Sequence, residues 1–224
     1  GRTGVRRIPV DGEYRMKSEA LVAAIAEDRA AGWTPFCVVA TLGTTSSTSV
    51  DPCAALADIC RREKLWLHVD AAYAGAAAIV PELRPLLDGW ERADSIVVNP
   101  HKWMFTPFDA SLLLFRSPET FRDAFSLVPE YLRTPEVAGV HNFNEYGIQL
   151  GRRFRALKMW MLIRWFGVDG ITARLREHMR LAHLFASWVA FCENLGHDPF
   201  LGDVPPDLHI NFFIVYACRY RRGI

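Results

Sequence analysis

The chain has 224 residues, half of them hydrophobic, and a formal net charge of only +1 at pH 7. This length accommodates one large domain, or one domain and part of another, and the hydrophobic fraction suffices for a packed core. The near balance of charge argues against a nucleic-acid or membrane-surface partner. No apolar run approaches membrane-spanning length, and no secretory signal opens the chain.

The five cysteines follow no spacing typical of a metal site or a disulfide framework, which favours a reducing compartment. We therefore expect a cytoplasmic protein. His68 and Asp70 form a His-x-Asp pair that could bind a metal, but no third ligand of suitable spacing accompanies them. No metal is expected.

The first part of the chain predicts a connector with a possible strand at residues 5–8, followed by a helix over residues 18–31. Ser18 is the expected cap of this helix, because its hydroxyl can accept a free backbone N–H. A buried strand is expected at residues 36–41, and Asp51 is the expected cap of a helix that reaches about residue 64.

The middle of the chain predicts strands at residues 65–70, 95–98 and 111–115, because each is a short apolar run bounded by residues that favour turns. A short helix is expected at residues 81–87, and another at residues 117–125. The order strand, helix, strand up to residue 70 is typical of a parallel sheet.

The last part of the chain predicts a long loop at residues 126–150, with little periodicity and several prolines and glycines. A helix over residues 151–166 should end at Gly167, and a second helix should occupy residues 168–194. A strand is expected at residues 210–216. We divide the chain into part of a large domain, 1–160, and the start of a small C-terminal domain, 161–224.

Two of the expected strands lead into residues whose side chains can take part in catalysis. Asp70 ends one strand, and Lys102 follows shortly after the next. Ligands of parallel sheets collect beyond the carboxyl ends of the strands, so we expect both side chains to face one crevice. Pyridoxal phosphate needs such a pair, an amine for a Schiff base and an acid beside the pyridine nitrogen.

Four sequence blocks resemble the group II pyridoxal-phosphate decarboxylases, most closely the aromatic L-amino acid decarboxylase branch. The blocks are Val39-Ala-Thr-Leu-Gly-Thr-Thr45, His68-Val-Asp-Ala-Ala-Tyr-Ala-Gly75, Asn99-Pro-His-Lys-Trp103 and Gly151-Arg-Arg-Phe-Arg-Ala-Leu-Lys158. Trp103 and the Gly-Arg-Arg-Phe-Arg run favour the aromatic branch over the glutamate branch.

The resemblance implies an α/β fold, the C-terminal half of the mostly parallel large domain of a fold type I, aspartate-aminotransferase-like enzyme. It also implies that the family's upstream half, with its ring-stacking histidine and phosphate-binding residues, is missing. We therefore expect a fragment whose catalysis is weak or absent.

The resemblance also assigns cofactor-binding roles. It makes Lys102 the Schiff-base lysine and Asp70 the partner of the protonated pyridine nitrogen. It places Ala72 against one face of the ring, Thr45 near the ring substituents and Asn99 near the phosphate. Taken alone, Thr45 and Asn99 would more often be turn residues.

Two further residues of the site have competing interpretations. The resemblance places His101 beside the phosphate or the substrate, whereas a histidine satisfied by its own loop is an equal alternative. It aligns Tyr131 with a tyrosine on a mobile catalytic loop (residues 126–150) that donates a proton to Cα, whereas an isolated loop tyrosine is often a surface aromatic. In plant relatives, Phe at this position accompanies aldehyde formation, and Tyr accompanies simple decarboxylation.

A cluster of basic residues is expected on the helix that starts at residue 151, where it should form salt bridges between domains instead of a nucleic-acid site. The basic residues are Arg152, Arg153, Arg155 and Lys158, and the candidates for the buried helix face are Phe154, Leu157 and Trp160.

The resemblance therefore implies a carboxy-lyase, a homodimer in its complete form, that converts an aromatic L-amino acid into the amine and carbon dioxide. Two alternatives remain: a decarboxylase of another amino acid or an aldehyde-forming relative, and a truncated, non-catalytic dimerisation partner.

Overall fold

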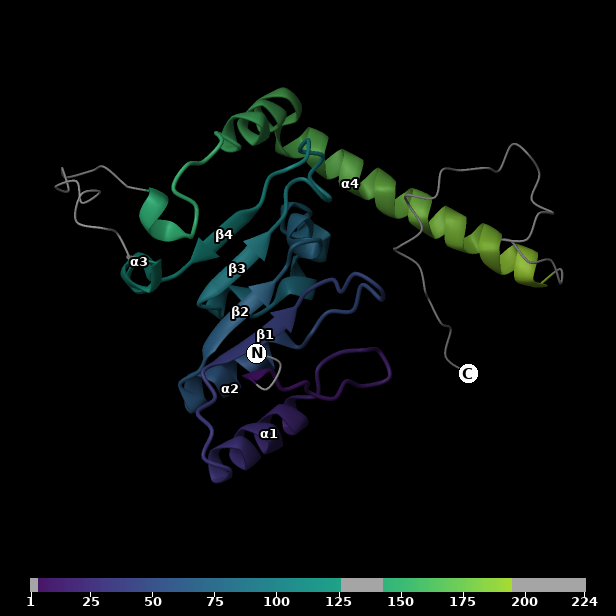
Figure 1. Ribbon diagram of the computed structural model, residues 1–224. Coiled ribbons are helices and arrows are strands. Elements are labelled where there is room, and N and C mark those ends of the chain that lie inside the picture. Colours follow the sequence, from purple (N-terminus) through teal and green to yellow (C-terminus); the bar gives the residue numbers. More distant parts are fainter. Residues whose placement is uncertain (1–3, 126–142, 195–224) are drawn as a thin grey trace.

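The computed structural model describes residues 4–125 and 143–194, and its centre is a four-stranded sheet (Figure 1). The strands are β1 (Cys37–Thr41), β2 (Trp66–Asp70), β3 (Ser95–Val98) and β4 (Leu112–Phe115), in the spatial order β1-β2-β3-β4. The first three strands are parallel, and β4 is antiparallel to β3. The predicted α/β class with a mostly parallel sheet is confirmed.

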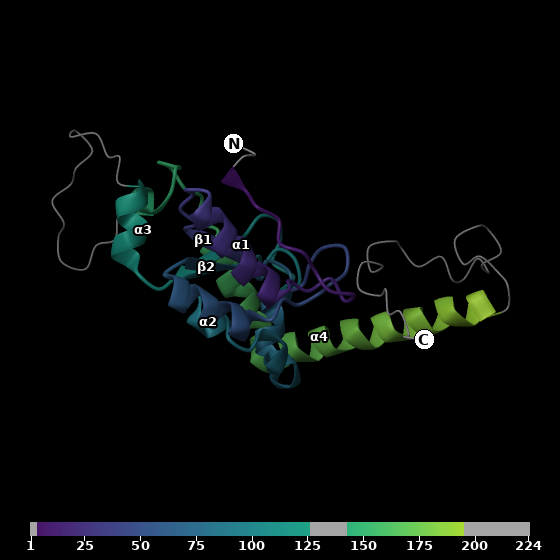
Figure 2. The ribbon, with the colours of Figure 1, turned by 90° about the horizontal axis from the view of Figure 1, so that it is seen from below.

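Helix α2 (Cys53–Glu63) packs on β1 and β2, and α1 (Ser18–Ala30) packs against α2 near the β1 edge of the sheet (Figures 1 and 2). α2 connects β1 to β2, which confirms the predicted strand–helix–strand unit. Alternate residues of β1 and β2 are buried in the same core as the inner face of α2, among them Val38, Leu56 and Leu67. Each fully buried side chain of this kind contributes about 1.5–3 kcal/mol.

Three sequence-based expectations for the N-terminal part were wrong. No strand forms at residues 5–8, and the nearest β-contact is an isolated bridge between Val10 and Met16. Ser18 is the first helical residue instead of the cap, and Lys17 holds the cap position without a side-chain hydrogen bond. Asp51 does not cap α2 either, because its carboxylate accepts the backbone N–H groups of Met16 and Thr41.

Short 3-10 helices fill the connection from β2 to β3: η2 (Ala74–Ile79), η3 (Pro81–Leu87) and η4 (Trp90–Arg92). The expected helix at residues 81–87 is thus present as a 3-10 helix. β4 leads into α3 (Pro118–Phe125), as predicted, and η6 (Phe143–Tyr146) follows the first gap in the described chain. The expected strand at residues 210–216 and most of the loop at 126–150 lie outside the described residues.

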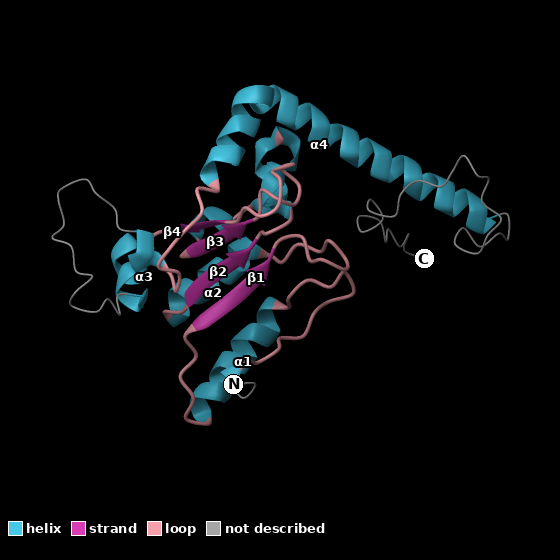
Figure 3. Cartoon of the chain, turned by 45° about the horizontal axis from the view of Figure 1, so that its top comes forward, coloured by secondary structure: helices cyan, strands magenta, loops and turns pink. Residues whose placement is uncertain are grey.

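The last helix, α4 (Ala156–Asn194), is two helices joined at Gly167, whose φ of 64° breaks the helical backbone as the sequence predicted. Its first turn begins at Ala156, five residues later than expected. Leu162, Ile171 and Leu175 of α4 are buried against Val80, which attaches the middle of the helix to the sheet layer. The remainder of α4 extends away from the sheet (Figure 3).

The predicted buried face of this helix is wrong. Phe154 is 75% exposed, Trp160 is 57% exposed, and Leu157 is also exposed. Phe154 precedes the helix, and the contact with the sheet layer is made instead by Leu162 and by residues beyond Gly167. No helix within residues 4–125 and 143–194 is long and apolar enough to cross a membrane.

One ion pair fastens α4 to η3. Arg176 donates from Nε and Nη2 to the two carboxylate oxygens of Glu82, at 2.6 and 2.8 Å. These hydrogen bonds lower the pKa of Glu82 from 4.5 to about 2. Because the pKa is lower in the folded state, the pair stabilises the fold above about pH 4.5 and loses this effect as the pH falls toward 2.

We therefore expect Glu82→Gln to lower the urea midpoint of unfolding at pH 7, and this difference from the wild type to shrink as the pH falls below about 4.5. This difference in urea midpoint is measured by urea unfolding of both proteins at pH 7, 4 and 3. Arg176→Gln and the double variant complete the cycle, in which the second substitution should add little to the first. A difference that is constant with pH would contradict this role of the pair.

Candidate active site

The carboxyl ends of β2 and β3 bring two of the predicted site residues to one edge of the sheet. Asp70 is the last residue of β2 and is the register partner of Val97 in β3. Lys102 lies in the turn four residues after the end of β3. The two loops are hydrogen-bonded to each other, since the Asn99 N–H donates to the Ala72 carbonyl at 3.0 Å.

A cavity of about 120 Å³ lies at this edge. Its lining brings together two predicted residues, Thr45 and Lys102, with three that were not assigned to the site, Thr44, Thr48 and Tyr73. The sequence did contain a signal for the threonines, because the loop after β1 is rich in hydroxyl side chains. The lining places an amine among hydroxyl groups. Asp70, Ala72, Asn99 and His101 do not belong to this lining.

Asp70 and Ala72 form one local unit at the end of β2. The Ala72 N–H donates to Oδ1 of Asp70 at 3.0 Å, which fixes the carboxylate relative to the strand. The next residue, Tyr73, stacks on Trp103 with the ring centroids 5.3 Å apart and the planes 5° from parallel. This stack joins the loop after β2 to the residue that follows Lys102.

Asn99 and His101 bind within their own loop. The Asn99 side-chain oxygen accepts the Ser111 hydroxyl at 2.7 Å. The Ala110 N–H donates to Nδ1 of His101 at 3.0 Å. The His101 contact agrees with the alternative of a histidine satisfied by its own loop. The roles of Asn99 and His101 near the phosphate stay predictions, and Tyr131 lies outside the described residues.

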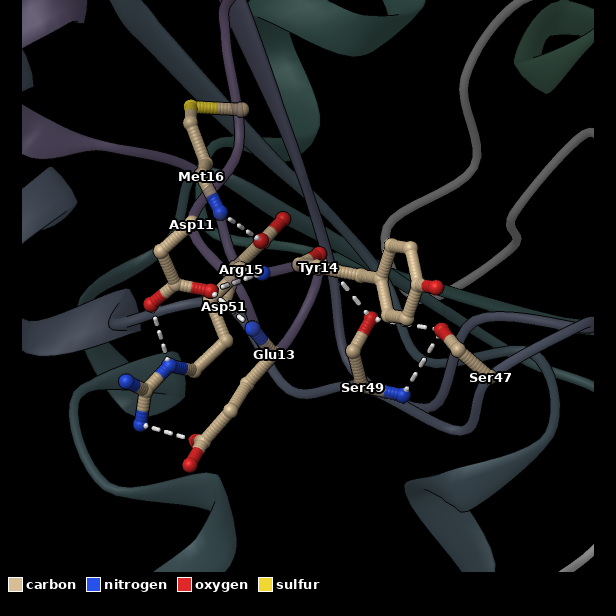
Figure 4. Close-up of polar contacts among 8 residues, drawn as sticks. All are labelled: Asp11, Glu13, Tyr14, Arg15, Met16, Ser47, Ser49 and Asp51. Atoms are coloured by element: carbon tan, nitrogen blue, oxygen red, sulfur yellow. Dashed lines mark hydrogen bonds and ion pairs between the residues drawn. The ribbon is translucent and has the colours of Figure 1, made fainter. Parts of the chain in front are cut away.

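The loop after β1 is joined to the N-terminal segment through Ser49 and Asp51, as Figure 4 shows. Oγ of Ser49 lies 2.9 Å from the Thr44 hydroxyl and donates to the Tyr14 carbonyl at 3.1 Å. Asp51 accepts the Met16 N–H at 2.7 Å. These contacts tie residues 44–51 to the N-terminal segment, so the hydroxyl wall of the cavity is held by residues 30 or more positions away in the sequence.

Glycine permits the close approach of the loops after β1 and β2, which carry the lining residues Thr44 and Tyr73. A Cβ on Gly43, whose φ is +86°, would lie 2.6 Å from Cβ of Ala74. The loops after β1 and β2 therefore contact each other only because this position has no side chain. A larger residue at position 43 would push apart the two loops that line the cavity.

Two of the expected basic residues form salt bridges with Asp109, in the loop that follows Lys102. Arg153 and Arg155 both pair with Asp109, at 2.5 and 2.9 Å, and Arg155 chiefly lowers the pKa of Asp109. The sequence placed these arginines around the helix, but α4 begins at Ala156, so both lie before it. Their salt bridges stabilise the connection between the 104–111 loop and the start of α4.

The donor groups at this edge fit pyridoxal phosphate. A lysine amine and threonine hydroxyls line one cavity, and a fixed carboxylate ends the adjacent strand, next to the small side chain of Ala72. Amine, carboxylate and hydroxyls match the aldehyde, the ring nitrogen and the polar substituents of this cofactor. Lys102, Asp70 and Thr45 are therefore the residues that would hold it.

Comparison with known proteins agrees with this chemistry. The family model described as "Pyridoxal-dependent decarboxylase conserved domain" matches residues 1–195. The rat protein "Aromatic-L-amino-acid decarboxylase" is 46% identical over 191 residues, which are 84% of this chain and 40% of the relative. The Arabidopsis thaliana protein "Phenylacetaldehyde synthase" is 44% identical over 179 residues, 79% of this chain and 36% of the relative.

Solved structures show the same similarity. The crystal structure of Oryza sativa TDC with PLP and tryptamine is 40% identical, with a TM-score of 0.79, over 83% of this chain and 39% of that one. Catharanthus roseus tryptophan decarboxylase in complex with L-tryptophan has a TM-score of 0.76, at 38% identity over 83% of this chain and 40% of that one. The chain thus spans about two fifths of the length of the relatives it matches. It belongs to the pyridoxal-dependent decarboxylase family.

Proposed function

We propose that the protein is a pyridoxal-phosphate-dependent carboxy-lyase that converts an aromatic L-amino acid into the amine and carbon dioxide. The observation that carries the proposal is the cavity that joins Lys102 to the hydroxyl loop after β1, beside the strand that ends at Asp70. The aromatic-amino-acid decarboxylases among the relatives support the substrate class.

When bound, pyridoxal phosphate supplies a ring that accepts the electron pair left as carbon dioxide departs. Lys102 would hold the cofactor through its Nζ atom. Asp70 would accept a hydrogen bond from the protonated ring nitrogen, and its negative charge would keep that proton in place. The Thr45 hydroxyl would orient the ring substituents, and Tyr131 would supply the proton to Cα.

Lys102 is exposed in the described chain. A lysine is nucleophilic only when its amine is neutral, and exclusion of water favours the neutral form. The described residues do not supply this exclusion by themselves. We therefore propose that the 224-residue chain binds the cofactor but turns over weakly or not at all on its own.

We also propose a cytoplasmic homodimer for the complete protein. The exposed apolar residues along the first half of α4, including Trp160 and Trp165, support a large contact with further protein. Sedimentation velocity of the complete protein should give the mass of a dimer, and a monomer at micromolar concentration would contradict the proposal.

The reaction is tested by product analysis. The complete protein that carries this chain is incubated with pyridoxal phosphate and separately with tyrosine, tryptophan, dopa and glutamate. We expect one of the aromatic amino acids to give amine and carbon dioxide in equal amounts. Turnover of glutamate alone would refute the substrate class, and absence of carbon dioxide from all four would refute the reaction.

A second reaction is favoured by one of the relatives. The similarity to the Arabidopsis protein "Phenylacetaldehyde synthase" allows an aldehyde-forming enzyme, in which ammonia and hydrogen peroxide accompany the aldehyde. The same product analysis separates the two, because only this alternative consumes oxygen. A non-catalytic dimerisation partner is the third candidate, and the absence of product from all four amino acids would favour it.

A further inference from the structure

Three side chains form a hydrogen-bond chain on the sheet face that carries Asp70. Trp66, His68 and Asp70 alternate along β2 and so project to the same side. Ser95 of β3 is the register partner of His68 and is only 4% exposed. Nε1 of Trp66 donates to Oγ of Ser95 at 2.9 Å, and the same Oγ lies 2.8 Å from Nδ1 of His68.

The chemistry of these groups indicates which atom donates in each of the two hydrogen bonds. An indole N–H can only donate, so the Ser95 oxygen is the acceptor in its contact with Trp66. The Ser95 hydroxyl hydrogen has Nδ1 of His68 as its described acceptor. If Nδ1 carried the proton, its N–H would donate to Oγ of Ser95, and the buried hydroxyl hydrogen would lose that acceptor. This pattern of donors and acceptors favours neutral His68 with its proton on Nε2.

We propose that His68 is a positioning residue of the cofactor site: Trp66 and Ser95 hold its imidazole neutral, with the proton on Nε2, so that the negative charge of Asp70 stays available to the ring nitrogen. This inference rests on the proposed function, because it assigns Asp70 to that nitrogen. It adds three residues that neither the cavity nor the expected site contained.

The physical reason is competition for one carboxylate. Two residues along a strand span roughly 6.6 Å, so an imidazolium at position 68 would attract the Asp70 carboxylate and compete with the ring nitrogen for it. Burial lowers the pKa of His68, whereas the charge of Asp70 raises it. On the neighbouring strand β1, the Cys37 thiol contacts the His68 backbone and its pKa is raised, so it contributes no charge.

The tautomer is measured directly by long-range proton–nitrogen NMR of the chain labelled at its seven histidines, with His68→Asn to assign the signal. We expect a neutral Nε2–H imidazole for His68 at pH 7. Ser95→Ala should give a mixture of tautomers that protonates at higher pH, and Ser95→Thr, which keeps the hydroxyl, should restore the wild-type signal. An Nδ1–H form or an imidazolium in the wild type at pH 7, or an unchanged signal in Ser95→Ala, would overturn the inference.

A second measurement concerns the cofactor and needs no turnover. The dissociation constant of pyridoxal phosphate is measured by absorbance titration at pH 6 and pH 8 for the wild type, Ser95→Ala and Ser95→Thr. We expect Ser95→Ala alone to bind about tenfold more weakly than the wild type at pH 6, with a smaller difference at pH 8, where its imidazole is neutral. If the wild type does not bind the cofactor, the proposed function fails. If the wild type binds it and Ser95→Ala matches it at both pH values, the positioning inference fails alone.

Discussion

Lys102→Ala is expected to abolish covalent labelling of the chain by pyridoxal phosphate and borohydride. Borohydride reduces the bond between a lysine amine and the cofactor aldehyde, so the label remains on whichever lysine held the cofactor. The chain has only four lysines, Lys17, Lys64, Lys102 and Lys158, and of these Lys102 lines the cavity at the strand ends. Peptide mapping by mass spectrometry should find one label per chain, at Lys102.

Lys17→Ala is the matched control, because Lys17 is equally exposed but lies before α1, outside the cavity. We expect this variant to be labelled like the wild type. Among the residues that the structure describes, none forms a hydrogen bond or ion pair with the Lys102 side chain, so circular dichroism of Lys102→Ala should match the wild type. Equal labelling of the wild type and Lys102→Ala would remove Lys102 from the site, because the label would then reflect surface lysines.

Asp70→Asn is expected to lower turnover of the complete protein roughly 10²–10³-fold, the range found when one preorganised electrostatic partner is removed from an active site. Asparagine has almost the same shape and keeps an oxygen that can accept the Ala72 N–H. It lacks the negative charge that holds the proton on the ring nitrogen, so the ring accepts electrons less well. The change therefore tests charge more than structure.

The measurement is the rate of carbon dioxide release at saturating cofactor, with labelling at Lys102 as a parallel readout. Labelling should persist in Asp70→Asn, because Lys102 is intact, while the rate falls. Asp88→Asn, an exposed carboxylate at the end of η3, is the control and should leave the rate unchanged. A wild-type rate in Asp70→Asn would show that another group holds the ring nitrogen.

Local pattern determined the elements that are continuous in the sequence. Short apolar runs ending at breakers gave β1 to β4 within a residue or so, and Gly167 broke α4 where it was expected to. Caps were predicted less well. Asp51 has the composition of a helix cap, but its carboxylate was taken by the backbone of Met16, a contact between residues 35 positions apart that no local pattern contains.

For the candidate site, the sequence by itself determined which residue types stand at the strand ends: Asp70, Ala72, Lys102 and the hydroxyl loop that contains Thr45. Strand periodicity and a four-block resemblance are enough for that, because both are properties of adjacent residues. Only the tertiary structure decided which of these groups share a cavity. It also decided that Nδ1 of His101 and the side-chain oxygen of Asn99 accept hydrogen bonds within their own loop, and that Ser95 contacts His68. Those outcomes depend on the register between strands and on the competition of buried polar groups for partners, and both are settled only when distant segments pack together.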